Sequence, residues 1–403
     1  MYKLTRLDKQ LAISAVTLSV IYYFYSFVYN GFLPEPLFYN KNDTFMDFYN
    51  LQYWTYNENR YTYWQSIYSP FSFVFVTFFT SDNVLNPFDL RDISFISIAV
   101  FLFIAICLVA YFQSKSMISG NKLLWVYILI MSSPFLFTIE RGNLVLYALI
   151  FLQISIMNYK NTFIFSLFLA LAVSLKIYLI ALLFIPILNL DFSKTVVTLF
   201  WFIVINVICG ILLQDSNWLL FLKNISEFTS SPRHFEWSYF TYSYQNLLSA
   251  ATYVYPQYKF IGVTANLLML LIVLLLFGSV SIKYFISTKY IKNRERNTII
   301  ALLLMLIMIV VKNSGGYVFI LLFPFVAAII FNRISFYMFL LLLLPIELNL
   351  IEWDILGFHS YLSGNQVSVA RNITSGMIIR PLLFLTLYIF ISINLLCKRN
   401  TNV

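Results

Sequence analysis

The chain has 403 residues, of which 61% are hydrophobic and 11% are charged, and its formal net charge is +9. Ordinary globular domains carry about 25% charged residues, so this composition excludes a soluble globular protein and indicates an integral membrane protein. The apolar runs are continuous rather than alternating, which is typical of membrane-spanning helices and not of barrel strands.

The predicted elements are apolar runs that reach or approach the length needed to cross a hydrocarbon core about 30 Å thick. We therefore expect an all-α polytopic membrane protein, a single membrane domain over residues 1–403 with about twelve transmembrane helices. The first run follows a basic N-terminus and lacks a small-residue cleavage site, so it is interpreted as an uncleaved span. In chain order the runs are 10–30, 93–113, 122–139, 143–157, 161–174, 177–190, 194–213, 261–282, 297–311, 317–331, 334–350 and 377–396.

The longest connection, residues 31–92, separates the first two runs. Its stretch "DTFMDFYN" places Asp43 and Asp47 four residues apart among aromatic side chains. A carboxylate in a mostly enclosed cavity, its pKa raised by desolvation, can act as a general base, and Asp47 is the first candidate with Asp43 second. Either residue can instead cap a helix or join a local ion pair. The apolar segment 67–80 is too short for a full crossing and is interpreted as an interfacial or re-entrant helix.

The distribution of Lys and Arg predicts which connections are cytoplasmic, because cytoplasmic loops carry the excess of both residues. The strongest signal is the basic segment 283–296, which lies on the same side as both termini. We therefore expect cytoplasmic termini in the plasma (inner) membrane and three extracytoplasmic loops, at 31–92, 214–260 and 351–376. Topology accounts for the positive charge, so no nucleic-acid partner is indicated.

Most remaining charges fall at the predicted outer ends of the spans, where ionisable residues are costly and indicate function. A group of cations at headgroup depth suits a lipid phosphate, since Arg and Lys form charge-assisted hydrogen bonds to phosphate oxygens. Candidate phosphate-binding residues are Arg141, Lys176, Lys312, Arg371 and Arg380, and candidate substrate-binding residues are Glu140, Asn143, Tyr68, His234, Tyr317 and His359.

Each of these residues also has a structural interpretation. Arg141 can pair with its neighbour Glu140 at the end of a span, and a lysine such as Lys176 or Lys312 can snorkel to the interface. The two histidines can be polar loop residues. All three cysteines fall in apolar runs and the histidines are far apart, so no metal site is expected. No cofactor is required, and a divalent ion bridging Asp47 and a phosphate is an open alternative.

Four segments together resemble a known family. They are "MDFYN" with "YSPFSF" about twenty residues later, "ERGNLVLYALIFL", "LALAVSLKIYLIALLFIPIL" and "SGGYVFILLFPF". In order and rough spacing, they are similar to the motifs of the polyprenyl-phosphate-sugar-dependent glycosyltransferases of the GT-C fold, most closely the alpha-mannosyltransferase-like glycosyltransferase family 87.

The resemblance implies inverting transfer of one hexose, of mannose or glucose type, from a polyprenyl-phosphate donor to a lipid-linked or cell-surface glycan acceptor on the outer face. Asp47 would be the general base, with Arg141 and Lys176 near the donor phosphate. The single proline in "YSPF", Asn143 in place of a frequent Gln, and Ile177 after the lysine leave the sugar open.

Two other functions are weighed against this one. An O-antigen or other surface-polysaccharide polymerase would be favoured if Arg233 and Arg371 were essential and Asp47 dispensable. A lipid or sugar transporter or flippase usually shows internal repeats and midplane charges, whereas here the charges collect at one face. Membrane lipids are expected partners in every case.

Overall fold

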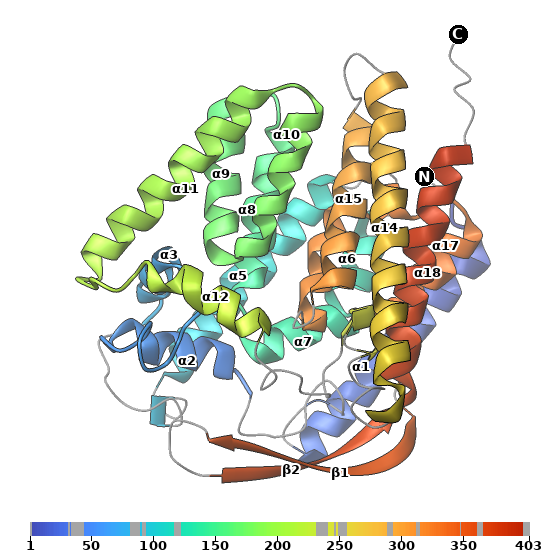
Figure 1. The fold of residues 1–403 in the computed structure, drawn as a ribbon. Coiled ribbons are helices and arrows are strands. Elements are labelled where there is room, and N and C mark those ends of the chain that lie inside the picture. Colours follow the sequence, from blue (N-terminus) through green and yellow to red (C-terminus); the bar gives the residue numbers. More distant parts are fainter. Residues whose placement is uncertain are drawn as a thin grey trace.

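The computed structural model describes residues 2–30, 33, 44–80, 89–90, 94–116, 122–230, 241–245, 247–248, 256–287, 293–311, 315–346, 348–360 and 366–397. Over these ranges the chain is a helical bundle with one two-stranded antiparallel hairpin (Figure 1). In chain order the elements are α1 (Arg6–Asn30), α2 (Met46–Thr55), α3 (Pro70–Thr77), α5 (Phe95–Ser116), α6 (Lys122–Ile130), α7 (Ser133–Arg141), α8 (Val145–Met157), α9 (Thr162–Leu175), η2 (Ile177–Leu183), α10 (Phe184–Leu188), α11 (Phe192–Leu212), α12 (Leu220–Ser230), η4 (Pro256–Tyr258), α14 (Lys259–Ser287), α15 (Asn293–Val310), η5 (Gly316–Phe325), α16 (Val326–Ile329), α17 (Arg333–Leu343), β1 (Asn349–Ser360), β2 (Gln366–Thr374) and α18 (Ser375–Cys397).

The helices confirm a multi-pass membrane protein. In the described part of the chain, α1, α5, α11, α14 and α18 are each long and apolar enough to cross a bilayer. The pair α6 and α7 makes a sixth candidate, bent by 53° at a short break. Each predicted apolar run contains a helix, but several of these helices are too short to cross alone. The count of twelve crossings therefore stays a prediction.

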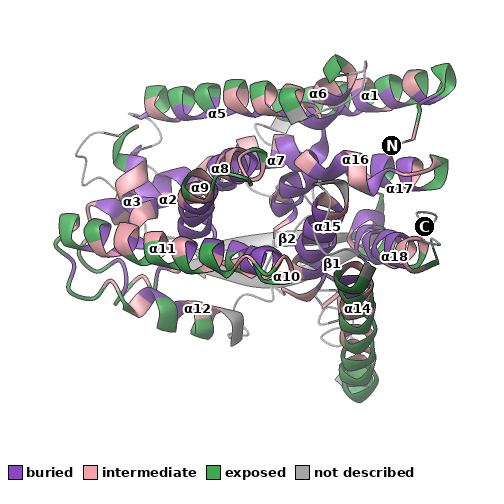
Figure 2. Cartoon of the chain, turned by 90° about the horizontal axis from the view of Figure 1, so that it is seen from above, coloured by how far each residue is buried: buried purple, intermediate pink, exposed green. Residues whose placement is uncertain are grey.

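The outer helices carry the surface that a bilayer would cover. Figure 2 shows exposed residues along the outward faces of α1, α5, α11 and α14. Many of these residues are large and apolar, among them Phe24, Phe103, Ile211 and Leu267. An apolar outer belt of this kind is expected of helices that face lipid. The segment η5, in contrast, lies in the interior of the bundle. It is buried along most of its length and packs against α7, α8 and α15.

Loops predicted to share a side of the membrane lie together in the structure. At one end of the bundle, the buried carboxylate of Asp8 accepts a hydrogen bond from Tyr337 and lies 3.4 Å from Arg333, which joins the N-terminus to the start of α17. At the other end, Asn224 of α12 donates to the backbone oxygen of Tyr61, which joins two of the predicted outer loops. The segments α2, α12 and the hairpin occupy this second end (Figure 1).

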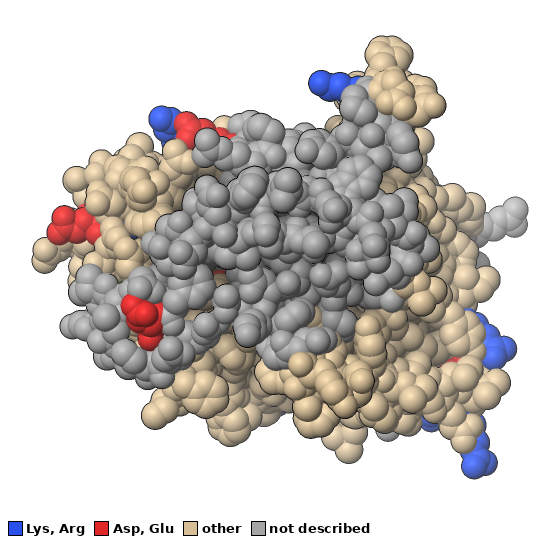
Figure 3. Space-filling view, turned by 90° about the horizontal axis from the view of Figure 1, so that it is seen from below, with Lys and Arg blue, Asp and Glu red and all other residues tan. Residues whose placement is uncertain are grey.

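Seen from this second end, the described charged side chains are few and lie toward the periphery (Figure 3). Buried and half-buried charges, among them Asp47, Arg141 and Lys176, also lie at this end.

Two predicted segments differ from the structure. The run 334–350 was expected to be one helix, but α17 ends at Leu343, because Pro345 disfavours helical backbone in the residue before it. Within the predicted outer loop 351–376, the described residues form most of strands β1 and β2, in which Trp353 pairs with Arg371, whereas no strands were expected. The side of the membrane on which this segment lies stays a prediction. The segment 67–80 contains α3, an eight-residue helix about 12 Å long that packs against α2, α9 and α11.

Candidate active site

Asp47 lies in the first turn of α2, and its position is fixed by Phe45, the residue that precedes the helix. Phe45 adopts a left-handed backbone conformation with φ of 62°, and its N–H donates to the backbone oxygen of Glu140 at 2.7 Å. This bond ties the start of α2 to the end of α7. A carboxylate in the first turn of a helix is also favoured by the helix dipole. The sequence thus presents the Asp47 side chain toward the end of α7.

Arg141 is the last residue of α7 and forms an ion pair with Asp47. Its Nε lies 3.1 Å from Asp47 Oδ1, and its Nη2 contacts the same oxygen. The helix stops here because Gly142 takes a left-handed conformation with φ of +62°. A Cβ at this glycine would lie 2.9 Å from the Cβ of Phe48, so both the backbone conformation and the packing require glycine.

Asn143 connects the start of α8 to the same carboxylate. Its Oδ1 accepts a hydrogen bond at 2.9 Å from the backbone N–H of Val145, the first residue of α8. This bond directs the amide nitrogen the other way, and Nδ2 donates to Asp47 Oδ2 at 2.6 Å. Both carboxylate oxygens of Asp47 are therefore held, one by Arg141 and the other by Asn143.

Lys176 is the single residue between α9 and η2. Its backbone is extended and its side chain is buried. Its Nζ lies 5.2 Å from the centre of the Tyr68 ring and 5.6 Å from that of Tyr317, within the range of cation–π attraction. The hydroxyl of Ser69 donates to the backbone oxygen of Ser174 at 2.6 Å, which fastens the start of α3 beside the end of α9. This contact holds Tyr68 near Lys176.

The site is half-open, and its carboxylate is stabilised in the charged form. The side chains of Asp47 and Arg141 are 15% and 18% exposed. Burial alone would raise the pKa of Asp47, but the charge and hydrogen bonds of Arg141, the hydrogen bond of Asn143 and the nearby charge of Lys176 lower it below its ordinary value. The expected upward shift of this pKa is therefore wrong, because the sequence did not reveal that Arg141 contacts Asp47.

Tyr178 is a residue that the sequence interpretation left without a role. It follows Lys176 by two positions in "SLKIY" and is an electrostatic neighbour of Tyr68 and Tyr317. Its hydroxyl oxygen is buried and has no hydrogen-bond partner among the described residues. Its nearness in sequence to Lys176, on a polar break in a long apolar run, was the available signal.

Other predicted site residues have different placements. Glu140 is buried, does not pair with Arg141 as the alternative proposed, and accepts a hydrogen bond from Thr44 at 3.2 Å. Arg380 is fully buried in α18, with Tyr23 and Tyr242 as electrostatic neighbours, and so belongs to a different part of the bundle. Asp43, His234 and Lys312 lie outside the described residues, as do the side chains of His359 and Arg371.

Within the described ranges, no group of three or more His, Cys, Asp or Glu side chains is placed to hold a metal ion. The site described here consists of one carboxylate, two cations, an amide and three tyrosines.

Comparison with known proteins gives one match. The model of glycosyltransferase family 87 matches residues 67–312, which is more than half of the chain. No curated protein matches the sequence, and no solved structure does. The matched range includes Arg141, Asn143 and Lys176.

Proposed function

Because the chain belongs to glycosyltransferase family 87, a family that makes it a membrane glycosyltransferase, we propose that it moves one hexose from a polyprenyl-phosphate donor to a lipid-linked or cell-surface glycan. The hexose is of mannose or glucose type. The observation that carries this proposal is the convergence of Asp47, Arg141, Asn143 and Lys176, from three separate segments, at one end of the bundle.

Asp47 acts as the general base in this proposal. The acceptor hydroxyl gives its proton to Asp47 while its oxygen bonds to the anomeric carbon of the donor sugar. The bond from that carbon to the phosphate oxygen breaks on the opposite face, so the configuration inverts and polyprenyl phosphate leaves with the electron pair. Arg141 and Lys176 stabilise the charge that develops on the phosphate.

The ion pair between Asp47 and Arg141 links binding of the donor phosphate to activation of the base. With no donor bound, Arg141 holds the carboxylate ionised and oriented. A donor phosphate competes for the guanidinium, since Arg binds phosphate and carboxylate oxygens through the same geometry. Once Arg141 contacts the phosphate, Asp47 loses its strongest partner and becomes a stronger base, while Asn143 keeps it oriented. Binding of the donor thereby activates the base.

The tyrosines around Lys176 bind the sugar. Tyr68 and Tyr317 offer aromatic faces beside the cation, and the buried hydroxyl of Tyr178 supplies a donor and an acceptor for a sugar hydroxyl.

The proposal includes the finer fold and topology. The fold is GT-C-like with about twelve helices, both termini are cytoplasmic, and the site opens on the outer face of the plasma membrane. The excess of Lys and Arg at the end that carries the termini supports this orientation. The reaction needs no cofactor, because a phosphate leaves without metal activation when cations surround it.

The test is transfer by purified protein in nanodiscs. The protein is incubated with a panel of radiolabelled polyprenyl-phosphate hexoses and a lipid-linked glycan fraction, and the labelled glycan is measured. We expect one monosaccharide to be transferred. Joining of whole repeat units from pyrophosphate lipids, with no transfer from any monosaccharide donor, would favour the polymerase. Movement of lipid across the bilayer without bond formation would favour the flippase.

A further inference from the structure

A second group of cations lies at the other end of the α8–α9 hairpin. Helix α8 runs from the Asp47 site to Met157, just before Tyr159, and α9 returns to Leu175, just before Lys176, so about 20 Å of helix separates the two groups. The Arg296 guanidinium carbon lies 4.0 Å from the centre of the Tyr159 ring, and Lys194 Nζ lies 4.8 Å from the same centre. Asn189 fixes the ring by donating to its hydroxyl at 2.7 Å.

The cations of this second group are more buried than cations usually are at the end of a helix. Arg296 is 7% exposed and Lys194 is 6% exposed. Lys194 pairs with Asp191, so its charge is balanced. No ion pair with Arg296 is found in the described ranges, and its Nε is buried without a hydrogen-bond partner there. A buried guanidinium without an anion is costly, and the cost falls when an anion binds.

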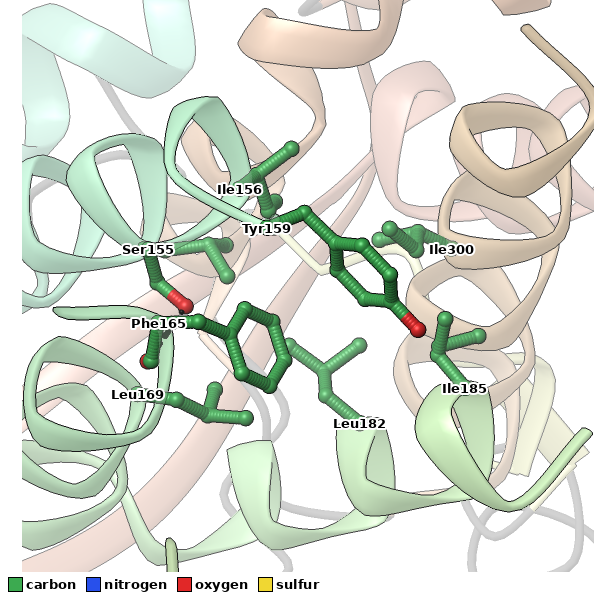
Figure 4. Close-up of a pocket in the computed structure, with 9 residues that line it drawn as sticks. Ser155, Ile156, Tyr159, Phe165, Leu169, Leu182, Ile185 and Ile300 are labelled. Atoms are coloured by element: carbon green, nitrogen blue, oxygen red, sulfur yellow. Dashed lines mark hydrogen bonds between the residues drawn. The ribbon is translucent and has the colours of Figure 1, made fainter. Parts of the chain in front are cut away.

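An apolar cavity adjoins this group. It is small, with room for about one water molecule, and it lies between α8, α9, η2, α10 and α15, with the ring of Tyr159 forming part of its wall (Figure 4). The rest of its lining is almost entirely aliphatic and aromatic, including Phe165, Leu182 and Ile300. The Tyr159 ring therefore contacts two cations and also lines this small apolar cavity.

We propose that this group forms a binding site for a lipid phosphate, distinct from the Asp47 site. The phosphate contacts Arg296, with Lys194 nearby, and the hydrocarbon chain lies in the bilayer along the exposed apolar face of α11, where Phe192 and Val196 flank Lys194. Charge complementarity favours an anionic headgroup, and this apolar face favours its chain. Two sources share this chemistry, an anionic phospholipid of the membrane and a polyprenyl phosphate.

Native mass spectrometry of the full-length protein in detergent tests the site by binding, without reference to transfer. The probes are two matched pairs, dioleoyl phosphatidylglycerol with dioleoylglycerol, and undecaprenyl phosphate with undecaprenol. Arg296→Gln is expected to lower the apparent affinity for the lipid phosphate by about tenfold, with little change for the phosphate-free partner. Loss confined to the phospholipid or to the polyprenyl phosphate identifies the source.

Three further variants guard against misfolding as the explanation. Asp191→Asn keeps the oxygen that accepts from Ser193 but removes the charge that balances Lys194, so the proposal predicts tighter lipid binding, by about threefold. Arg296→Lys keeps the charge and should bind more tightly than Arg296→Gln. Lys115→Gln removes an exposed cation beside Tyr111 and should bind as the wild type does.

Equal binding of the lipid phosphates by wild type and Arg296→Gln would overturn the proposal. So would weaker or unchanged binding in folded Asp191→Asn, which is decisive even if Arg296→Gln does not fold.

Discussion

Two Asp–Arg pairs lie at the two ends of α2, and they differ in how much freedom their charges keep. At the start of the helix, the side chains of Asp47 and Arg141 are 15% and 18% exposed, so each keeps part of its surface accessible. After the end of the helix, Arg60 and Asp215 lie 3.4 Å apart and are 4% and 3% exposed. The same two residue types thus appear once in a half-open site and once in the protein interior.

Their other bonds explain the difference. Arg60 donates to the backbone oxygens of Trp54, Thr55 and Asn57, so it occupies the free carbonyl groups at the end of α2. It serves as a fixed cap that joins this helix to the segment before α12. Arg141 is bound to Asp47 in a partly exposed pair, where our proposal has an incoming phosphate exchange with the carboxylate. In that proposal the first pair changes partners when the donor binds, and the second stays closed.

The largest expected effect comes from replacing an aspartate with asparagine in each of the two pairs and comparing the rates of transfer. Asp47→Asn removes the base and should lower the rate of transfer by about 10³-fold, within the range of general-base catalysis. Asp215→Asn makes the same change in the closed pair and should leave the turnover of folded enzyme within a few-fold of wild type. Turnover per folded molecule, measured for both variants, checks this prediction. Similar losses in the two variants would remove the distinction between the pairs.

Arg60→Gln should show the opposite behaviour. It leaves Asp215 buried without its cation and frees carbonyl groups of α2, so it should lower the free energy of unfolding by about 3 kcal/mol. The thermal unfolding midpoint in nanodiscs measures this loss. Lys223→Gln is the matched control, since its pair with Glu227 is largely exposed and contributes little. An unchanged midpoint for Arg60→Gln would show that the closed pair is not structural.

Lys176→Gln tests how much of the phosphate binding beside the half-open pair depends on this second cation. Removing this cation should weaken donor binding and transfer together by about tenfold, because the phosphate keeps Arg141. The KM for the donor and the kcat give the readout. The control is Lys160→Gln, which changes an exposed lysine at the other end of α8. Loss of folding rather than of donor affinity would assign Lys176 to packing beside Tyr68 and Tyr317.

The smallest expected effect is a shift in pH dependence. Arg141 and Asn143 lower the pKa of Asp47 below its ordinary value, so in the free enzyme the base stays ionised at lower pH than an ordinary aspartate does. The kcat/KM of wild type should therefore show no loss due to Asp47 between about pH 5 and 7. In Arg141→Gln burial is no longer opposed by that charge, the pKa rises, and the acid side of the profile moves to higher pH. Superimposable profiles would contradict the ion pair.

Much of the fold could be predicted from the sequence, because membrane helices are specified by local composition. Apolar runs located the helices, and the break at Lys176 separated α9 from η2 as expected. The excess of Lys and Arg grouped the loops into two ends, and the contacts of Asp8 and Asn224 each join two segments that were predicted to share an end. The side of the membrane on which each end lies stays a prediction. The hairpin was missed, although Pro345 marked the end of the preceding helix.

The site was only partly predictable, because its key contact joins residues 94 positions apart. Adjacent charges in "ERGN" drew attention to a pair between Glu140 and Arg141, yet neighbouring residues in a helix point in different directions and do not face each other. Instead, α7 ends just before Gly142, and the Arg141 side chain contacts Asp47 of α2. Tyr178 has no charge, and its nearness to Lys176 was only a weak signal, so the three-dimensional grouping with Tyr68 and Tyr317 was needed to identify it.

The most direct test of the central claim measures donor binding and transfer on the same sample of Asp47→Asn. If Asp47 is the base and Arg141 holds the phosphate, the variant should bind the polyprenyl-phosphate hexose within about threefold of wild type, or more tightly, while transfer is lost. Tighter binding is possible because in this variant Arg141 does not have to break an ion pair before it contacts the donor phosphate. Transfer at the wild-type rate, or a loss of binding as large as the loss of transfer, would contradict the account.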